Sequence, residues 1–404
     1  MNILFISNLY PAYPGQSRTE MTYALHQFAK EWIKTDEKVL SIALWDCYPA
    51  LFSFFSDFAK KKKEYNTEEL FHLDLVPILR MPTFKIPHFP YTQREINRLR
   101  KRILINLNDL RYKPDILVVH GLYPAQIASS IKSELQIPMI TGIHSTDTIR
   151  IRKKRFPEIS RRILRESDSL AFRSMSLKNQ LMQTIPELLA DKNSFVAFSG
   201  VTQQITISQD QLAEKISRRN KDFIIMSACH LKRRKNIHLL IKAFARMKNR
   251  RSELIILGDG PEKKRLEGLA RDLDVSERIR FVGYQPRTQV FEFMREADIF
   301  VLASHSETLG LVYLEAMASG CITVGTKGEG IDGVIENGVN GFLVTPDEAS
   351  LVRTLHHILE LSPEKRLNIL SNALKTTSAM TEQKCAAHYL KNIQAVVKDF
   401  NGKN

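Results

Sequence analysis

The chain has 404 residues, 43% of them hydrophobic, which exceeds what one ordinary core supports, so we expect two domains of roughly 200 residues each. A formal net charge of +15 predicts attraction to anions, although nucleic acid, anionic lipid and phosphorylated substrates all qualify. The four cysteines lack CxxC pairing and histidines at zinc spacing, which argues against a disulfide framework or structural metal and indicates a reducing compartment.

The first segment, Met1–Gly15, has no basic region and stays apolar for only about ten residues, too few to span a bilayer. We therefore interpret it as a core strand rather than a signal or anchor. No other stretch is long and apolar enough to cross a membrane. We expect a cytoplasmic protein, with peripheral attachment to the inner face of the cytoplasmic membrane left open.

Short apolar runs alternate with helical patterns along the whole chain, which is typical of βαβ units and parallel sheets. The expected strands are Ile3–Ile6, Lys38–Leu44, Ile116–His120, Met139–Gly142, Ser169–Ser174, Phe195–Phe198, Phe223–Ala228, Glu253–Leu257, Ile279–Val282, Ile299–Ala303, Ile322–Thr326 and Gly341–Val344. This pattern predicts an α/β fold of two doubly wound domains, with ligands outside the carboxyl ends of the strands.

A polar segment, Thr202–Asp222, separates the two series of strands. We accordingly predict an N-terminal domain over residues 1–205 and a C-terminal domain over residues 206–385. The helical pattern at 386–404 predicts a last helix, whose return to the N-terminal domain is left open.

The segment from Ser304 to Val344 carries the most chemical information. Glu307 and Glu315 are eight positions apart, and Gly310 stands between them at the start of a predicted helix, Leu311–Ala318. The free N–H groups and positive dipole end of such a helix suit a diphosphate, and glycine permits close approach of the backbone. Glu315 is placed to accept hydrogen bonds from a ribose diol, and Glu307 from sugar hydroxyls. Acidic residues that only complement the helix dipole would explain either glutamate alone.

A basic loop and two glycine turns accompany this glutamate pair. The loop Cys229–Asn236 follows a predicted strand, and its cations can neutralise a leaving diphosphate, although two or three of the five basic side chains are expected to be simply solvated. The turn Gly258–Pro261 is as consistent with a structural turn as with ligand contact. Gly328–Gly333 matches G-x-G-x-x-G but lacks room for the required helix, so we expect a loop over the donor. Asp272–Asp274 is predicted to be a helix end, not a metal site.

These motifs resemble the donor-binding half of the family 4 retaining glycosyltransferases. The resemblance rests on the E-x7-E pair, the GDGP turn, Phe281–Gly283, Glu315–Gly320 and the run Glu336–Val344, and it weakens before Phe223. It implies the GT-B fold, with two Rossmann-like domains facing each other across a cleft, the acceptor in the N-terminal domain and a nucleotide-diphosphate sugar in the C-terminal one.

The resemblance also implies roles for individual residues. Lys235 would grip the diphosphate, Glu315 the ribose, and Glu307 with the amides of Leu309–Val312 the sugar and phosphate, while Gly283–Tyr284 would border the base. One departure is His230, which stands where the family usually has arginine. A free histidine is only partly charged at neutral pH, so Arg233 or Arg234 is expected to supply the second cation. In that event its replacement should lower turnover as severely as Lys235→Ala.

Candidate residues of the N-terminal half are fewer. His144 and Asp147 resemble the family's H-x-x-D element, which implies a catalytic position for His144, whereas a buried structural histidine is the alternative; His120 is a weaker candidate. Gly15 and Arg18 follow the first strand and are candidate acceptor-binding residues, together with Glu20. Ser199-Gly200-Val201 resembles the family's interdomain hinge.

Aromatic and basic residues predict a further contact. Tyr48–Glu64 places four phenylalanines beside four lysines, which suits either a helix at an anionic membrane surface or a core helix with a solvated end. Arg94–Arg102 and Arg150–Arg165 add basic surface. An anionic membrane is therefore a possible partner, while nucleic acid is not expected because strand aromatics and a recognition helix are lacking.

The sequence thus predicts a retaining hexosyltransferase that moves sugar to a glycan or lipid-linked acceptor without metal or cofactor. By the resemblance, the leaving phosphate oxygen deprotonates the acceptor hydroxyl, and helix amides with Lys235 stabilise its charge. The alternatives are a sugar-nucleotide epimerase or phosphorylase of the same fold, and a non-catalytic nucleotide-sugar sensor.

Overall fold

A computed structural model describes residues 1–16, 21, 23–47, 65–84, 89–152, 157–217, 222–247 and 251–402 of the chain. These residues form two units. The first comprises Met1–Arg173, Leu177–Ser199 and Glu382–Asn404, and the second Ser174–Ser176 and Gly200–Thr381. The chain therefore passes from one unit to the other at Ser199/Gly200 and at Thr381/Glu382, a few residues before each of the boundaries drawn from the sequence.

The first unit is built on an eight-stranded sheet in the order β3-β4-β2-β1-β5-β6-β7-β8, whose strands are parallel except for β3. Its strands are β1 (Asn2–Ser7), β2 (Lys38–Cys47), β3 (Glu69–Leu73), β4 (Val76–Phe84), β5 (Ile116–His120), β6 (Met139–Ile143), β7 (Ser169–Phe172) and β8 (Ser194–Val196). The buried strands β1, β5 and β6 are apolar almost throughout because helices cover both of their faces.

The hairpin of β3 and β4 is the part of this sheet that the sequence did not predict. β4 pairs in parallel with β2 and antiparallel with β3. Pro77 and Pro82 interrupt its apolar run, and proline normally argues against a strand inside a sheet. The hairpin was therefore missed because its prolines concealed the strand pattern.

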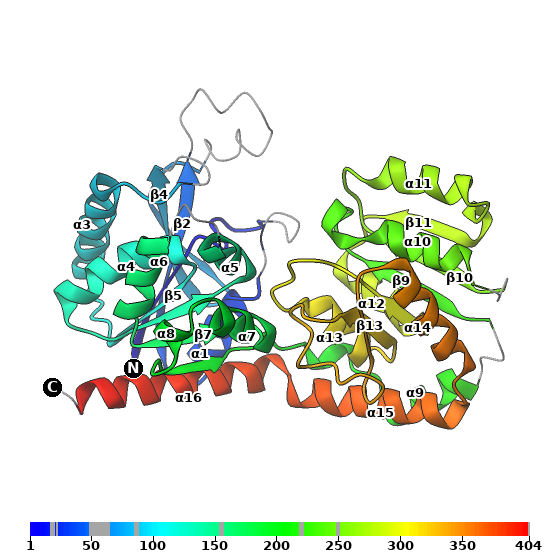
Figure 1. Cartoon of the computed structure of the whole chain (residues 1–404). Helices are drawn as coiled ribbons and strands as arrows, with labels where there is room; N and C mark the ends of the chain where they lie inside the picture. The colour runs from blue at the N-terminus through cyan, green and yellow to red at the C-terminus, as the bar shows by residue number, and fades with distance from the viewer. Residues whose placement is uncertain are drawn as a thin grey trace. The chain divides into compact units, whose positions relative to one another are not determined.

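Helices connect and cover these strands. They are α1 (His26–Ile33), α3 (Gln93–Asp109), α4 (Leu122–Leu135), α5 (Ser145–Arg152), α6 (Pro157–Glu166), α7 (Met175–Thr184) and α8 (Pro186–Leu189). One face of the sheet packs Leu4 and Ile6 with Leu99, Ile103 and Ile127 of α3 and α4. The opposite face, which carries Phe5, is covered by α1 and by the last helix of the chain, α16 (Glu382–Asn401) (Figure 1).

The helix α16 is tied to the first unit by specific contacts. Trp32 of α1 donates a hydrogen bond from Nε1 to the Ala386 carbonyl at 2.9 Å, and its ring meets that of Tyr389 edge to face at 5.2 Å. Phe28 also contacts Tyr389. The last segment of the chain thus completes the core on this face of the sheet.

The second unit has a six-stranded parallel sheet in the order β11-β10-β9-β12-β13-β14. Its strands are β9 (Ile224–Ala228), β10 (Glu253–Leu257), β11 (Ile279–Gly283), β12 (Ile299–Val301), β13 (Ile322–Thr326) and β14 (Phe342–Val344). In chain order this is 3-2-1-4-5-6, the order of doubly wound nucleotide-binding sheets, with its switch point between β9 and β12.

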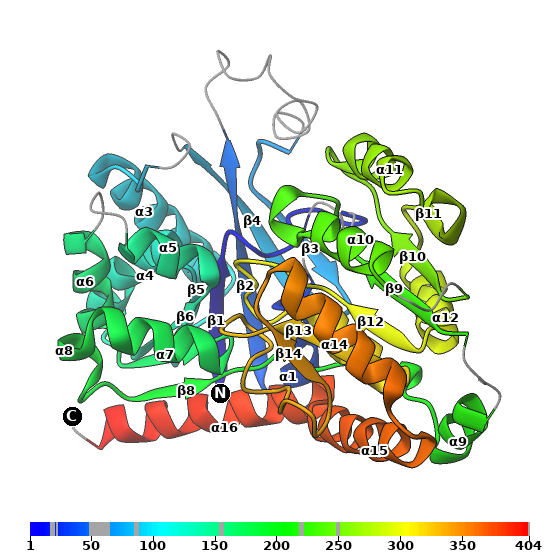
Figure 2. The same cartoon turned by 45° about the vertical axis from the view of Figure 1, so that its right-hand side comes forward.

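The helices of this unit lie on both faces of the sheet. They are α9 (Gln209–Ser217), α10 (Ile237–Ala245), α11 (Lys263–Asp272), α12 (Arg287–Glu296), α13 (Leu311–Ala318), α14 (Glu348–Glu360) and α15 (Pro363–Ala379), with the 3-10 turns η2 (Gln203–Ile205), η3 (Arg233–Lys235) and η4 (Ser276–Arg278). α10 packs with α11 and α14 (Figure 2). α13 packs with α12 and α15. Among the described residues, no helix combines the length and the apolar composition that crossing a membrane requires.

Candidate functional site

The switch point of the second unit brings together the two loops that the sequence singled out. β9 leads into η3, which ends at Lys235, and its neighbour β12 leads into the loop that carries Glu307. At a switch point the loops after adjacent strands diverge to opposite faces and leave a crevice for a ligand. Lys235 and Glu307, 72 positions apart, therefore meet at one end of the sheet.

The loop that carries Lys235 is fixed by its own backbone. Asn236 takes a left-handed conformation, with φ of 54°, between η3 and α10, and its buried Nδ2 donates to the Ala303 carbonyl at 2.8 Å. His305 N–H in turn donates to the Arg234 carbonyl at 2.8 Å. These bonds connect the two loops directly, so the cations and the carboxylate are held in place by the backbone.

Glu307 is the centre of a charged cluster. Its Oε1 forms an ion pair with Lys235 Nζ, and Arg234 Nη1 lies 3.3 Å from the same oxygen. The side chains of Lys235 and Glu307 are each 12% exposed, whereas that of Arg234 is 47% exposed. The structure therefore places Arg234, one of the two arginines expected to replace the missing family arginine, beside Lys235.

A second carboxylate in this cluster was not predicted. Glu329, from the loop after β13, accepts a hydrogen bond at Oε2 from the Glu307 N–H at 2.9 Å, and its Oε1 lies 3.9 Å from His305 Nδ1. The sequence placed Gly328–Gly333 in a loop rather than a helix, which is confirmed, but it gave Glu329 no role. Glu329 occupies a variable position of the G-x-G-x-x-G match, in which only the glycines are specified.

The helix α13 begins where the sequence placed it. Gly310 is its N-cap, with φ of 79°, and a Cβ there would lie 2.5 Å from the Tyr313 ring. Leu309 before it is buried, while Leu311 and Val312 form the first turn, whose N–H groups have no acceptor within a helix. Glycine is therefore required both by the backbone angle and by the neighbouring ring.

Glu315 lies one turn into α13 and is 8% exposed. Its Oε1 forms an ion pair with Arg287, the first residue of α12, whose guanidinium also lies 5.3 Å from the Phe291 ring centroid. Sequence reasoning did not identify Arg287. The helix dipole disfavours a cation in the first turn of a helix. An arginine directly after Pro286 could therefore have indicated that an anion lies nearby.

The turn Gly258–Pro261 packs on the loop after β9. A Cβ at Gly258 would lie 1.9 Å from the Cys229 carbonyl oxygen, and one at Gly260 2.6 Å from that of Leu231. His230 donates from Nδ1 to the Asp259 carbonyl at 2.6 Å, because a carbonyl can only accept. Backbone packing thus accounts for both glycines, and His230 is bonded to this turn while Arg234 is bonded to Glu307.

Gly283 and Tyr284, expected near the base, lie at the end of β11. Gly283 has φ of 80°, accepts from Gly258 N–H at 2.8 Å, and is followed by Tyr284, which is 59% exposed. Asp272 ends α11 and Asp274 is left-handed, which confirms a helix end for this D-x-D sequence. The site of the second unit therefore lies at the carboxyl ends of β9, β11 and β12.

In the first unit, His144 follows β6 at the carboxyl edge of the sheet. The fully buried Asp147 accepts at Oδ2 from His144 N–H at 3.0 Å and at Oδ1 from Leu122 N–H at 3.2 Å. Arg150 pairs with the same carboxylate, although desolvation raises the pKa of Asp147. The H-x-x-D element thus fixes the backbone that presents His144.

The His144 ring meets His120, the weaker candidate at the end of β5. His120 Nδ1 and His144 Nε2 are 3.0 Å apart, and His120 Nε2 is 3.1 Å from the Tyr389 hydroxyl of α16. Desolvation, and to a smaller extent the Arg173 guanidinium, lowers the pKa of His144 to about 3 and that of His120 well below its usual value. Both rings are therefore neutral at physiological pH.

The remaining N-terminal candidates are less constrained. Gly15 is exposed in the loop after β1, with φ of 74°, and a Cβ added there would have no neighbour within 4 Å. Arg18, Glu20 and Tyr48–Glu64 lie outside the described residues. Ser199 is buried at the end of the first unit, where its Oγ bonds to Arg173. In α3, Arg98, Arg100 and Arg102 pair with glutamates, so this basic segment carries less free charge than its sequence indicates.

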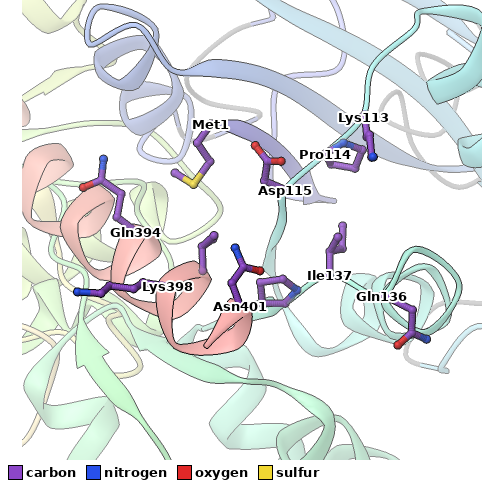
Figure 3. A pocket seen from close by; sticks show the side chains of 11 residues that line it. Met1, Lys113, Pro114, Asp115, Gln136, Ile137, Gln394, Lys398 and Asn401 are labelled. Atoms are coloured by element: carbon purple, nitrogen blue, oxygen red, sulfur yellow. The ribbon is translucent and has the colours of Figure 1, made fainter. Parts of the chain in front are cut away.

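A cavity of about 380 Å³ in the first unit contains none of these candidates. Met1, Asp115 and Pro138 line it just before β1, β5 and β6. Lys398 and Asn401 of α16 also line it (Figure 3). It therefore lies at the amino ends of the parallel strands, opposite the edge where doubly wound sheets bind ligands.

The sheet order and the helix start at the switch point define a doubly wound α/β protein. Residues 208–376 match the family described as Glycosyl transferases group 1. The chain is 28% identical over 236 residues to N-acetyl-alpha-D-glucosaminyl L-malate synthase of Bacillus anthracis, covering 57% of this chain and 61% of that protein. It is 30% identical over 195 residues to alpha-monoglucosyldiacylglycerol synthase of Acholeplasma laidlawii, covering 48% of each.

Among solved structures, HepE of Anabaena in complex with UDP has a TM-score of 0.70 at 18% identity, covering 98% of this chain and 100% of that one. The sequence matches span about half to three fifths of the two curated relatives, whereas the structural match extends over both units. The chain has the GT-B fold, and its residues 208–376 are similar to the group 1 glycosyltransferases.

Proposed function

We propose that this protein is a retaining glycosyltransferase that moves a hexose-type sugar from a nucleotide-diphosphate donor to a glycan or lipid-linked acceptor. The observation that carries the proposal is the pairing of Lys235 and Arg234 with Glu307 at the switch point, beside the N-terminus of α13. Two cations and a helix N-terminus suit a diphosphate, and a carboxylate beside them suits sugar hydroxyls.

The proposed chemistry follows from these groups. The bond from the anomeric carbon to the phosphate oxygen breaks, and the acceptor oxygen bonds to that carbon on the same face. The acceptor proton passes to the leaving phosphate oxygen. Lys235, Arg234 and the first amides of α13 stabilise the negative charge of the nucleoside diphosphate, and neither a metal nor a side-chain nucleophile is part of the proposal.

The nucleotide is proposed to be uridine diphosphate. HepE, which shares the fold, is described in complexes with UDP and with UDP-glucose. In this protein Glu315 with Arg287 would hold the ribose, and the exposed Tyr284 would lie at the base. A thermal-shift screen of UDP-, GDP- and ADP-sugars tests the assignment, because only a bound ligand raises the melting temperature by mass action. Stabilisation by none of them would contradict donor binding.

A lipid-linked acceptor at an anionic membrane is the finer part of the proposal. It is supported by the name of the Acholeplasma laidlawii relative, alpha-monoglucosyldiacylglycerol synthase, and by the net charge of +15. Sedimentation with vesicles of anionic phospholipid at low salt should retain the protein, and neutral vesicles are the control. If the protein does not sediment with anionic vesicles at low salt, the membrane part of the proposal is wrong and a soluble glycan is the acceptor class.

Donor turnover separates an enzyme from the alternatives. Release of nucleoside diphosphate that increases with acceptor identifies a transferase. Conversion of the nucleotide sugar without an acceptor identifies an epimerase, and binding without any turnover identifies a sensor.

A further inference from the structure

We infer that Tyr389 and His120 are positioning residues that hold the proton of neutral His144 on Nδ1, so that His144 presents a hydrogen-bond donor to substrate. The inference rests on the proposed function for what His144 does, but the proton position itself is a property of the free protein. The side chains of His120, His144 and Tyr389 all belong to the first unit.

Geometry makes the three groups one relay. The Tyr389 hydroxyl lies 3.1 Å from His120 Nε2, and His120 Nδ1 lies 3.0 Å from His144 Nε2. His120 and Tyr389 are fully buried, and the rings of Phe5 and Phe195 pack against them. The polar atoms of these buried side chains bond to one another, so the hydrogens are shared along the relay.

Two arrangements of the hydrogens satisfy these distances. In the first, Tyr389 donates to His120 Nε2, His120 donates from Nδ1 to His144 Nε2, and the His144 proton is on Nδ1. In the second, every donor is reversed, so that His144 donates from Nε2 and its Nδ1 is an acceptor. A neutral imidazole has one proton, which is why fixing one nitrogen fixes the other.

The buried phenol decides between them. Among the described residues, His120 is the hydrogen-bond partner recorded for the Tyr389 hydroxyl. In the second arrangement the phenol hydrogen would be buried without an acceptor, which is unfavourable, whereas the first arrangement pairs the hydrogens of both Tyr389 and His120. The first arrangement therefore dominates, and His144 is a donor at Nδ1.

The surroundings keep both rings neutral and in position. Arg173, itself buried, bonds to the Ala197 carbonyl and stacks on Phe28 at 4.8 Å, and its charge disfavours a second proton on either histidine. Gly142, paired with His120 in the sheet, leaves room for that ring: a Cβ there would lie 2.2 Å from His120 Nδ1. Cys385 of α16, whose thiol pKa is raised to about 11 by burial, adds no charge at neutral pH.

Nitrogen-15 spectra of the full chain labelled at histidine test the inference, since protonated and unprotonated ring nitrogens have different shifts. His144 is assigned by its absence in His144→Gln. We expect Nδ1 of His144 to be protonated in the wild type, and Tyr389→Phe, which keeps the ring but removes the hydroxyl, to reduce that population. With the donor found in the thermal-shift screen, the same variant should lower kcat about tenfold while KM for the donor changes little.

Tyr112→Phe is the matched control. It removes another phenol hydroxyl of the first unit, 2.8 Å from the Ile3 carbonyl, and should leave the His144 tautomer and kcat unchanged. A His144 proton on Nε2 in the wild type, or an unchanged tautomer in Tyr389→Phe, overturns the inference. The expected tautomer in a protein that turns over no nucleotide sugar supports the relay and contradicts the proposed function.

Discussion

The two units share a sheet plan but build their candidate sites from different chemistry. The second unit uses charged pairs at the carboxyl ends of the strands: Lys235 with Glu307 on the loops, and Arg287 with Glu315 on helices α12 and α13. The first unit uses a neutral, buried relay of Tyr389, His120 and His144. The same fold thus provides an ionic site, suited to a diphosphate, and a neutral one, suited to orienting a hydroxyl.

The largest effect is expected in the ionic site. Lys235→Ala should lower turnover about 100-fold, because a preorganised cation is removed from the developing diphosphate charge. Arg234→Ala should have a smaller effect than the equal one expected from the sequence, since its side chain is more exposed than that of Lys235. Arg233→Ala, in the same η3 turn, is the control. Steady-state kinetics on the three variants check the order, and equal activity in all three would show that the cluster does not contact the donor.

The neutral site should be the more sensitive to added volume. Gly142→Ala should lower the free energy of unfolding by about 2 kcal/mol, because its Cβ would meet the His120 ring and the sheet leaves little room for adjustment. Gly268→Ala, in helix α11, has its nearest neighbour 3.9 Å away and should leave stability unchanged or raise it. Urea denaturation measures both, and equal effects would mean that the ring moves freely.

The ion pair of Glu315 gives the next effect. Arg287→Gln should weaken UDP binding about tenfold, because it removes a cation that is paired with a buried carboxylate near the proposed anionic ligand. Arg295→Gln, on the same helix and bonded to the Gln204 carbonyl, is the control. Isothermal titration with UDP compares the two. Tighter binding in Arg287→Gln would instead mean that the arginine competes with the ribose.

The smallest expected effect is a pH dependence of stability that comes from the two histidines of the neutral site. The folded-state pKa of His144 is about 3 and that of His120 is also lowered, so below about pH 6.5 the unfolded chain binds protons that the folded chain does not. Stability should therefore fall as the pH is lowered from about 7.5 to about 5.5, by about 1 kcal/mol per histidine. His144→Gln should show a shallower fall, and an identical pH dependence in the variant would contradict burial of a neutral ring.

Much of the second unit could be predicted because its signals are local. Gly310 begins α13 as expected, Glu307 and Glu315 flank it, and each predicted strand there corresponds to an observed one. Strands that are covered on both faces are apolar throughout, so their sequences reveal them. A glycine next to a helical pattern indicates where the helix begins. The β3–β4 hairpin was missed because prolines in a short segment argue against a strand. The pairing of β4 with β3, which is distant from any single-segment pattern, tolerates them.

By itself the sequence determined the α/β class, the two series of strands and the glutamate pair with its basic loop, since these depend on periodicity and short-range spacing. Only the tertiary structure decided which charges meet: Arg234 rather than His230 beside Glu307, Glu329 at its amide, and Arg287 on Glu315. It alone joined Tyr389 to His120, 269 positions earlier. These side-chain contacts depend on the order of the strands in each sheet and on the packing of α16 against the first sheet. No local sequence pattern encodes either of them.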